Sequence, residues 1–361
     1  MSDGTGIEWT DATWNVVIGC DKVSRGCDHC YAIRTATRMT SNPDPKVSEP
    51  YAGTVKAGEW TGRVNLIEDR LTLPLRWRKP RRVFVNAQSD LFHKSVTDEF
   101  IARVFAVMAL APQHTFQILT KRPARMRSLL GGWGIHNLVM DRFANDDDLY
   151  VRRALAAGGG QAWPLPNVWI GVSVEDQKSA DLRIPILLDT FAAVRWLSCE
   201  PLLGPVNLTD HVDRWREEDG GECDWGHCSE AAVAVRRDYS HQDPVFACML
   251  PVCAAHRGLD WVVVGGESGP GARPMHPDWA RSLRDQCAAT GVPFLFKQWG
   301  EWAPDGFGIG RLQRGRTYVG GIIHVESGDL PYREIMTRVG KRSAGRELDG
   351  VLHDAYPGGA L

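Results

Sequence analysis

Seven short apolar runs recur along the chain, and each is continuous rather than alternating with polar residues. They cover residues 13–19, 82–87, 115–120, 167–173, 194–199, 260–266 and 292–297. Continuous apolar runs are typical of parallel strands that helices cover on both faces. Residues 98–112 and 277–291 read as crossover helices between such strands. The sequence therefore predicts an α/β fold, a partial or complete TIM-like barrel of parallel strands with helices outside.

The length of 361 residues and the hydrophobic content of 43% support a large buried core. We expect the barrel to span residues 1–302, followed by a C-terminal extension at 303–361. Two segments break the strand-helix repeat. Residues 128–166 are irregular or partly helical, and residues 210–259 form a cysteine-rich insertion.

Charge and cysteine usage limit the environment and the partners of the protein. The formal net charge of −2 gives no overall basic field for nucleic acid, although the basic segment 76–82 can still contact phosphate. There are nine cysteines, no signal-peptide pattern and no apolar run of transmembrane length. We therefore expect a cytoplasmic protein without a membrane partner, in which clustered cysteines bind metal rather than form disulfides.

Polar residues gather directly after the apolar runs. In a barrel of parallel strands, these positions meet at one face and form the active site. Ordinary loop polarity is the simpler alternative for any one of them. The candidate site residues are Asp90, Lys121, Ser173, Glu175, Cys199, Glu200, Gly265, Gly266 and Glu267.

Three cysteines follow the first run, namely Cys20, Cys27 and Cys30. A closed structural zinc site needs four ligands, whereas three thiolates can hold an iron-sulfur cluster and leave one iron open. The number of cysteines therefore fits a cluster with an open iron. His29 is a possible fourth ligand, and a Cys3His zinc site would remove the open iron.

A second cysteine group lies in the insertion at 210–259. Its members form two C-x4-C pairs, Cys223 with Cys228 and Cys248 with Cys253. This spacing lies within the range of zinc ligands and favours a structural zinc knuckle. Free buried cysteines that behave as small apolar residues are the alternative. Cys287, on a predicted helix, is expected in the core.

Seven ordered motifs carry a family resemblance that covers nearly the whole chain. They lie at residues 7–32, 119–123, 167–176, 197–206, 260–274, 292–302 and 340–357, and the first contains IEWTDATWNVVIGCDKVSRGCDHCYA. Together they resemble the phage Gp37/Gp68 family, which is distantly similar to radical S-adenosylmethionine enzymes. Those enzymes use C-x3-C-x-aromatic-C, whereas here the first gap has six residues and His29 precedes Cys30. The cysteine motif is therefore a variant.

The resemblance implies a chemistry and a set of roles. A four-iron, four-sulfur cluster on the three cysteines would bind S-adenosylmethionine at its open iron, with His29 and Tyr31 beside the cofactor. Reductive cleavage would then give a 5'-deoxyadenosyl radical, with electrons from a donor protein. Ser173, Glu175 and Glu267 are candidates for the methionine or ribose groups. Gly265 and Gly266 would allow close backbone approach, although simple turn chemistry is the alternative.

Four further candidates concern the substrate. Lys121 would hold an anionic group, with Asp90 or Glu200 balancing its charge, unless these residues only form structural ion pairs. Cys199 would donate a hydrogen atom to a product radical, as a cysteine does in the spore photoproduct lyase branch. A buried structural thiol is the alternative for Cys199.

The substrate class is predicted from aromatic and basic residues. Trp9, Trp14, Trp299 and Trp302 fall inside the family motifs, where they could stack on bases, although most tryptophans are core residues. With the basic segment 76–82 and the phage setting, they indicate a nucleobase, nucleotide or nucleic acid. Two other functions stay open. One is a zinc protein that binds nucleic acid without catalysis. The other is a divalent-metal hydrolase or nuclease that uses Asp90, Glu175, Glu200 and Glu267.

Overall fold

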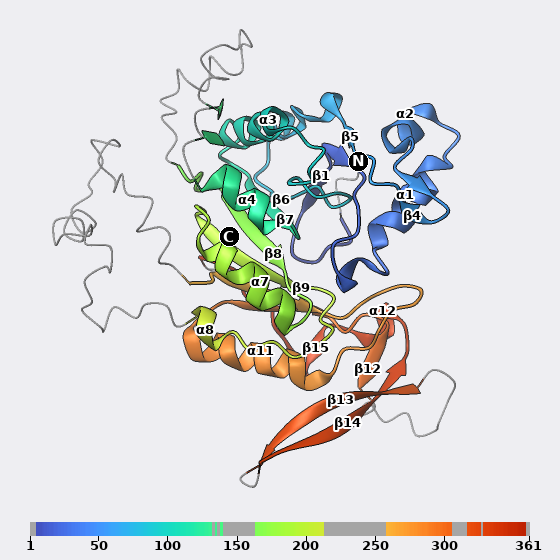
Figure 1. The fold of residues 1–361 in the computed structure, drawn as a ribbon, viewed down its shortest axis with the longest axis vertical. Coiled ribbons are helices and arrows are strands. Elements are labelled where there is room, and N and C mark those ends of the chain that lie inside the picture. Colours follow the sequence, from blue (N-terminus) through green and yellow to red (C-terminus); the bar gives the residue numbers. More distant parts are fainter. Residues whose placement is uncertain are drawn as a thin grey trace, which may run out of the picture.

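A seven-stranded parallel sheet organises the fold, and it curls into a half-barrel (Figure 1). This computed structural model describes residues 5–131, 134–135, 138–139, 163–212, 258–304, 316–325 and 328–358. The strands follow one another in the order β1-β6-β7-β8-β9-β10-β11. Their bounds are β1 Ala12–Trp14, β6 Arg82–Val85, β7 Thr115–Thr120, β8 Val168–Ser173, β9 Val194–Cys199, β10 Trp261–Gly265 and β11 Phe294–Gln298. The predicted α/β fold and the partial barrel are thus confirmed.

The sequence predicts one strand over the first apolar run, but this run divides in two. Its start, β1, pairs in parallel with β6, whereas β2 (Val17–Ile18) pairs antiparallel with β5 (Asn65–Leu66). Asn86 fixes the division, because its Oδ1 accepts hydrogen bonds from the backbone N–H groups of Val16 and Val17, both at 3.1 Å. The chain therefore leaves the sheet before it reaches the cysteines.

Helices cover the outer face of the sheet (Figure 1). They include α3 (Asp98–Ala109), α4 (Pro123–Leu130), α7 (Gln177–Leu188) and α11 (Pro277–Thr290), with the short α8 (Thr209–Val212) before the cysteine-rich insertion. The sequence begins two of them with local caps. Thr97 accepts a hydrogen bond from the backbone of α3, and Asp176 forms a capping box with Ser179 at the start of α7. The alternate, outward residues of the strands pack under these helices in the main core.

The inner face of the sheet carries a second, aromatic core made of Trp9, Phe84, Trp196, Trp261, Val263 and Leu295. The ring of Trp9 packs edge-on against Trp196, with centroids 5.2 Å apart. Gly171 makes room for this arrangement, because a Cβ there would lie 2.5 Å from the Trp196 indole. Side chains therefore fill the floor of the half-barrel.

A small region between β2 and β6 covers one side of the sheet's C-terminal end. Its longest element is α1 (Tyr31–Thr40), which follows the three cysteines directly. The other elements are η1 Arg25–Cys27, α2 Pro45–Ser48, η2 Glu49–Tyr51, β3 Val55–Lys56, β4 Glu59–Trp60, η3 Glu68–Arg70 and η4 Leu73–Arg76. Their own small core is Ile18, Ala36 and Tyr51.

The C-terminal extension has two parts. A three-stranded sheet of β12 (Trp302–Pro304), β13 (Arg316–Val325) and β14 (Gly328–Arg338) projects from the body (Figure 1). After α12 (Lys341–Ala344), β15 (Glu347–Leu348) and β16 (Val351–Leu352), the chain returns to the edge of β11. There the N–H of Phe296 donates to the carbonyl of His353 at 2.9 Å. This last part therefore closes an edge of the parallel sheet.

The structure describes only parts of the two segments that break the strand-helix repeat. In the segment 128–166, α4 continues to Leu130, and residues 140–162 lie outside the described part. The segment 210–259 lies almost entirely outside it. Among the described residues, none of the helices combines the length and the apolar character needed to cross a bilayer.

Candidate functional site

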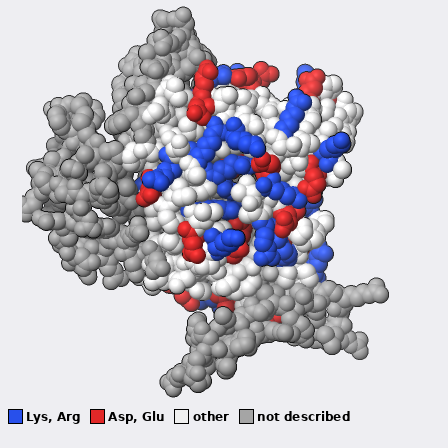
Figure 2. All heavy atoms as spheres, in the orientation of Figure 1, with Lys and Arg blue, Asp and Glu red and all other residues white. Residues whose placement is uncertain are grey.

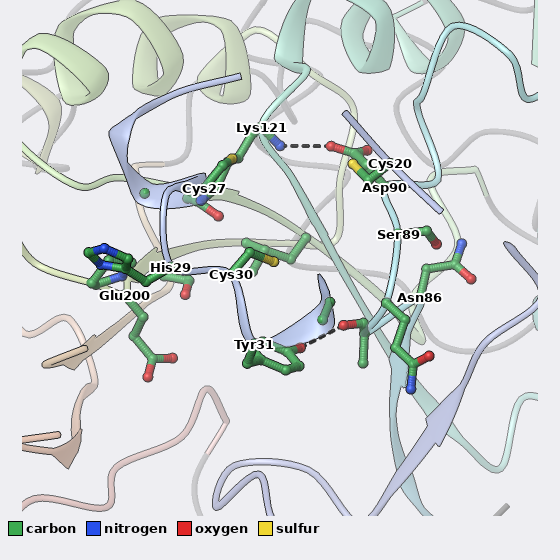
Figure 3. A pocket seen from close by; sticks show the side chains of 18 of the residues that line it. Cys20, Cys27, His29, Cys30, Tyr31, Asn86, Ser89, Asp90, Lys121 and Glu200 are labelled. Atoms are coloured by element: carbon green, nitrogen blue, oxygen red, sulfur yellow. Dashed lines mark hydrogen bonds between the residues drawn. The ribbon is translucent and has the colours of Figure 1, made fainter. Parts of the chain in front are cut away.

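A cavity of about 240 Å³ opens at the C-terminal ends of the parallel strands. All three cysteines of the first group line it, together with residues that follow β6, β7, β9 and β10. Figure 3 shows the side chains of Cys20, Cys27 and Cys30 around this space. The convergence that the sequence predicted therefore includes the cysteines themselves.

We call residues 20–30 the cysteine loop. Cys27 ends η1, and Cys30 stands immediately before α1. Burial, with the negative charge of Asp90, raises the pKa of Cys20 to about 12 against the opposing effect of Arg122. Burial also raises the pKa of Cys30. A bound metal would have to displace both protons, because thiolates are the ligand form.

Glu175 lies under the loop and is buried, with a side chain 1% exposed. Its Oε1 accepts from Ser24 Oγ at 2.8 Å and pairs with Lys121 Nζ at 2.8 Å, and its Oε2 pairs with Arg183 Nη1 at 2.9 Å. Burial alone would raise the pKa of Glu175, but the charges of Lys121 and Arg183 outweigh it and lower the pKa to about 2. Glu175 does not line the cavity, so it contacts the cysteine loop and not the space where a ligand could bind.

Glu267, after β10, holds the other side of the loop. It accepts from Arg273 Nη2 at 2.7 Å and Arg273 Nε at 2.9 Å, a bidentate pair. His29 Nδ1 lies 3.1 Å from Oε2 of the same carboxylate. Because an ionised carboxylate only accepts, His29 must donate this hydrogen bond from a protonated Nδ1. In the neutral tautomer of the ring, Nε2 is then the acceptor nitrogen. Burial would raise the pKa of Glu267, but the hydrogen bonds from Arg273 and His29 lower it.

Asp90 and Arg122 hold the start of the loop. Asp90 accepts from Thr120 Oγ1 at 2.8 Å and from the N–H of Lys121 at 3.0 Å. Arg122 pairs with Asp21 and places Nη2 4.0 Å from Cys20 Sγ. Asp90, a candidate catalytic residue in the sequence, lines the cavity, and these contacts also fix the turn after β7.

Glu200 pairs with Lys297 Nζ at 2.9 Å, and both residues line the cavity. Gly265 makes room for this pair, because a Cβ there would lie 2.7 Å from Glu200 Oε1. A Cβ on Gly266 would overlap the carbonyl of Trp299. The two glycines are therefore explained by close packing within the protein.

Charged side chains at the mouth are largely neutralised by each other. Figure 2 shows Lys and Arg side chains gathered over α4, with Asp and Glu among them. The pairs Lys121 with Glu175 and Arg122 with Asp21 belong to this pattern. Lys121 and Glu200 thus form ion pairs within the protein, as the alternative had it, and both also line the cavity.

Two predicted ligand contacts, Ser173 and Tyr31, line the cavity, whereas Ser198 and Trp60 were missed by the sequence reasoning. Ser173 and Ser198 face each other in register on β8 and β9, and both line the cavity. Trp60, on β4, lines it from the loop side. Tyr31 donates from its hydroxyl to the carbonyl of Ala87 at 2.6 Å, which ties α1 to the end of β6 (Figure 3). The period-two alternation of β9, in which Trp196, Ser198 and Glu200 share a face, is a signal that could have found Ser198.

Cys199 does not face the cavity, contrary to its predicted role as a hydrogen-atom donor. It is fully buried in the main core, on the helix side of β9. Burial raises its pKa well above the ordinary value. The alternative of a buried structural thiol therefore describes it, and Cys287 is buried in the same core as expected.

Most of the residues that indicated a nucleic-acid substrate are buried or lie away from the cavity. Trp14 and Trp299 are buried in the main core, and Trp302 donates from its indole to Ala272. Trp9 borders the cavity but is only 2% exposed. The basic segment 76–82 leads into the N-terminal end of β6, whereas the cavity lies at the C-terminal ends of the strands. Cys223, Cys228, Cys248 and Cys253 lie outside the described residues.

The cysteine loop brings three sulfur donors to one cavity. In the described part of the chain, no three His, Cys, Asp or Glu side chains converge as ligands of a single ion. Thiolates that bind different irons of a cluster stand farther apart than the ligands of one ion. Three sulfur donors around a cavity, with Arg122 close to one of them, fit such a cluster.

Fold and site together define a class of protein, a parallel half-barrel whose open end carries a three-cysteine loop beside a cavity. The chain belongs to the family described as "Protein of unknown function (DUF5131)", whose profile matches residues 4–357. No curated protein and no solved structure matches the chain.

Proposed function

We propose that this protein is a radical S-adenosylmethionine enzyme whose cluster is held by Cys20, Cys27 and Cys30. The observation that carries the proposal is that all three cysteines line one cavity at the C-terminal end of a parallel half-barrel. In barrels of parallel strands this end holds the active site. When bound, a four-iron, four-sulfur cluster with S-adenosylmethionine supplies a 5'-deoxyadenosyl radical that abstracts hydrogen from the substrate.

The residues of the chain bind and orient the reactants in this proposal. The cysteines give up their protons to bind iron, and Arg122 offsets part of the resulting negative charge. Ser173 and Ser198 offer hydroxyl groups to a ligand in the cavity. The aromatic floor around Trp9 keeps water out of the lower half-barrel.

The substrate class and the donor protein stay predictions. A nucleobase, nucleotide or nucleic acid remains our hypothesis, with Trp60 and Tyr31 as accessible aromatic side chains at the cavity. Electrons would come from a reduced donor protein, and a cytoplasmic location would suit it. The hydrolase alternative is less well supported, because Glu175 and Glu267 are committed to ion pairs with basic side chains.

The test is the release of 5'-deoxyadenosine from S-adenosylmethionine by anaerobically reconstituted protein and a strong reductant. We expect release by the wild type and none by Cys27→Ala. Cys287→Ala, which removes a buried thiol outside the cavity, should release it as the wild type does. A wild type that binds a cluster but releases no 5'-deoxyadenosine would contradict the proposed reaction.

A further inference from the structure

The cysteine loop is held from two sides by contacts that need no metal. On one side, Ser24 Oγ donates to Glu175 at 2.8 Å. Gly26 rests on the same carboxylate, where a Cβ would overlap Oε1 of Glu175. Glu175 is in turn fixed by Lys121 and Arg183. The loop backbone before Cys27 therefore lies directly on a buried, charged platform.

On the other side, Arg273 connects the loop to Glu267. Its Nη2 donates to the carbonyl of Arg25 at 2.8 Å, and its Nη1 lies 3.1 Å from Oδ2 of Asp28. The same guanidinium forms the bidentate pair with Glu267, so one side chain bridges a strand end and the loop. His29 adds a second contact to that carboxylate.

We propose that Glu175 and Glu267 are positioning residues, which hold the cysteine loop in its ligand-presenting shape before any metal is bound. The two carboxylates follow β8 and β10 and contact the loop on either side of Cys27, Glu175 at Ser24 and Glu267 at His29. The inference rests on the proposed function for its purpose, since a cluster would be the group so presented. It explains why both carboxylates, which the sequence marks as ligand contacts, are engaged by the loop, Glu175 below the cavity and Glu267 in its wall.

Hydrogen exchange in the metal-free protein tests the shape of the loop without a cluster. The N–H of Cys27 donates to Ser24 at 2.9 Å and that of Asp28 to Arg25 at 3.2 Å. We expect both amides to be protected in the wild type. Ser24→Ala removes the hydrogen bond, and Gly26→Ala pushes the backbone off Glu175, so both variants should lose this protection. The matched controls are Ser41→Ala, at an exposed hydroxyl, and Gly6→Ala, where no atom lies within 4 Å.

Iron retention tests the consequence for the cluster. After reconstitution, Ser24→Ala, Gly26→Ala and Arg273→Lys should lose iron to a chelator about 10–100-fold faster than the wild type. Their thermal midpoints should stay close to those of the controls Ser41→Ala, Gly6→Ala and Arg284→Lys. Equal midpoints would show that the faster iron loss does not come from a general loss of stability. Arg284 pairs with Asp349 at the surface, away from the loop.

Two results would overturn the inference, namely free exchange of both amides in the metal-free wild type, or variants that retain iron as well as the wild type does. A wild type that takes up no cluster would refute the proposed function instead. In that case the exchange experiment still decides whether the loop is held in place.

Discussion

At the residue scale, the buried charge of Glu175 links the stability of the fold to the cysteine loop. Glu175→Gln keeps the shape of the side chain but leaves Lys121 and Arg183 without their shared carboxylate. Breaking a buried ion pair in this way costs about 3–5 kcal/mol. We expect this loss in the free energy of unfolding by urea. Asp189→Asn, which breaks an exposed pair with Arg127 at 3.5 Å, should change it by less than about 1 kcal/mol.

The same carboxylate predicts a pH dependence of stability. Its pKa is lowered from 4.5 to about 2 in the folded protein, so the ionised form favours folding. This contribution, about 3 kcal/mol, is fully present above about pH 4.5 and is lost as the pH falls to about 2. The difference in unfolding free energy between the wild type and Glu175→Gln should therefore shrink over this range. A constant difference would show that Glu175 does not titrate as described.

Cys199 and Cys30 should behave in opposite ways when replaced by alanine. Cys199→Ala removes a buried thiol in the main core, so we expect a loss of about 1 kcal/mol in stability and an unchanged iron content. Cys30→Ala removes a thiol that lines the cavity, so iron binding should fail. Iron analysis after reconstitution compares the two. Loss of iron in Cys199→Ala would place that thiol at the site after all.

At the scale of elements, the aromatic floor depends on one glycine in β8. Gly171→Ala would place a Cβ 2.5 Å from the Trp196 indole, and such overpacking costs about 1–3 kcal/mol. We expect a lower thermal midpoint, partly restored in Gly171→Ala with Trp196→Phe, because the smaller ring makes room. Gly6→Ala serves as the control. A Gly171→Ala variant as stable as the wild type would mean that the ring can move aside.

The parallel strands were predictable because their signal is local. Each of the seven apolar runs overlaps one strand of the sheet, and the helices at 98–112 and 277–291 appear as α3 and α11. The division of the first run was not predictable, because it depends on Asn86, a residue far along the chain that binds the backbone of Val16 and Val17. Long-range contacts of this kind leave no mark on the local pattern of apolar residues.

The candidate site was predictable in location but less so in role. Three cysteines on one loop and polar residues at strand ends do meet at one cavity. Their roles depend on partners distant in sequence. Glu175 is engaged by Ser24 from the loop, and Glu267 by Arg273. Cys199 was misplaced because we ignored the alternation along β9, which turns Ser198 inward and Cys199 outward.

At the scale of the whole molecule, the half-barrel is closed by segments from both ends of the chain. Trp9, near the start, fills the floor, and Tyr356, near the end, packs on Trp261 with centroids 5.2 Å apart. Leu295 in the edge strand β11 bridges to Asp354. The lower half-barrel is therefore filled by protein, and a cavity stays open at the end beside the cysteine loop.

The iron and acid-labile sulfide content of anaerobically reconstituted full-length protein is the most direct test of the central claim. We predict about four irons and about four sulfides per chain in the wild type, with a broad visible absorption band. Cys27→Ala should bind far less, and Cys287→Ala should match the wild type. A colourless wild-type protein that binds only zinc after reconstitution would contradict the claim that the cysteine loop holds a cluster.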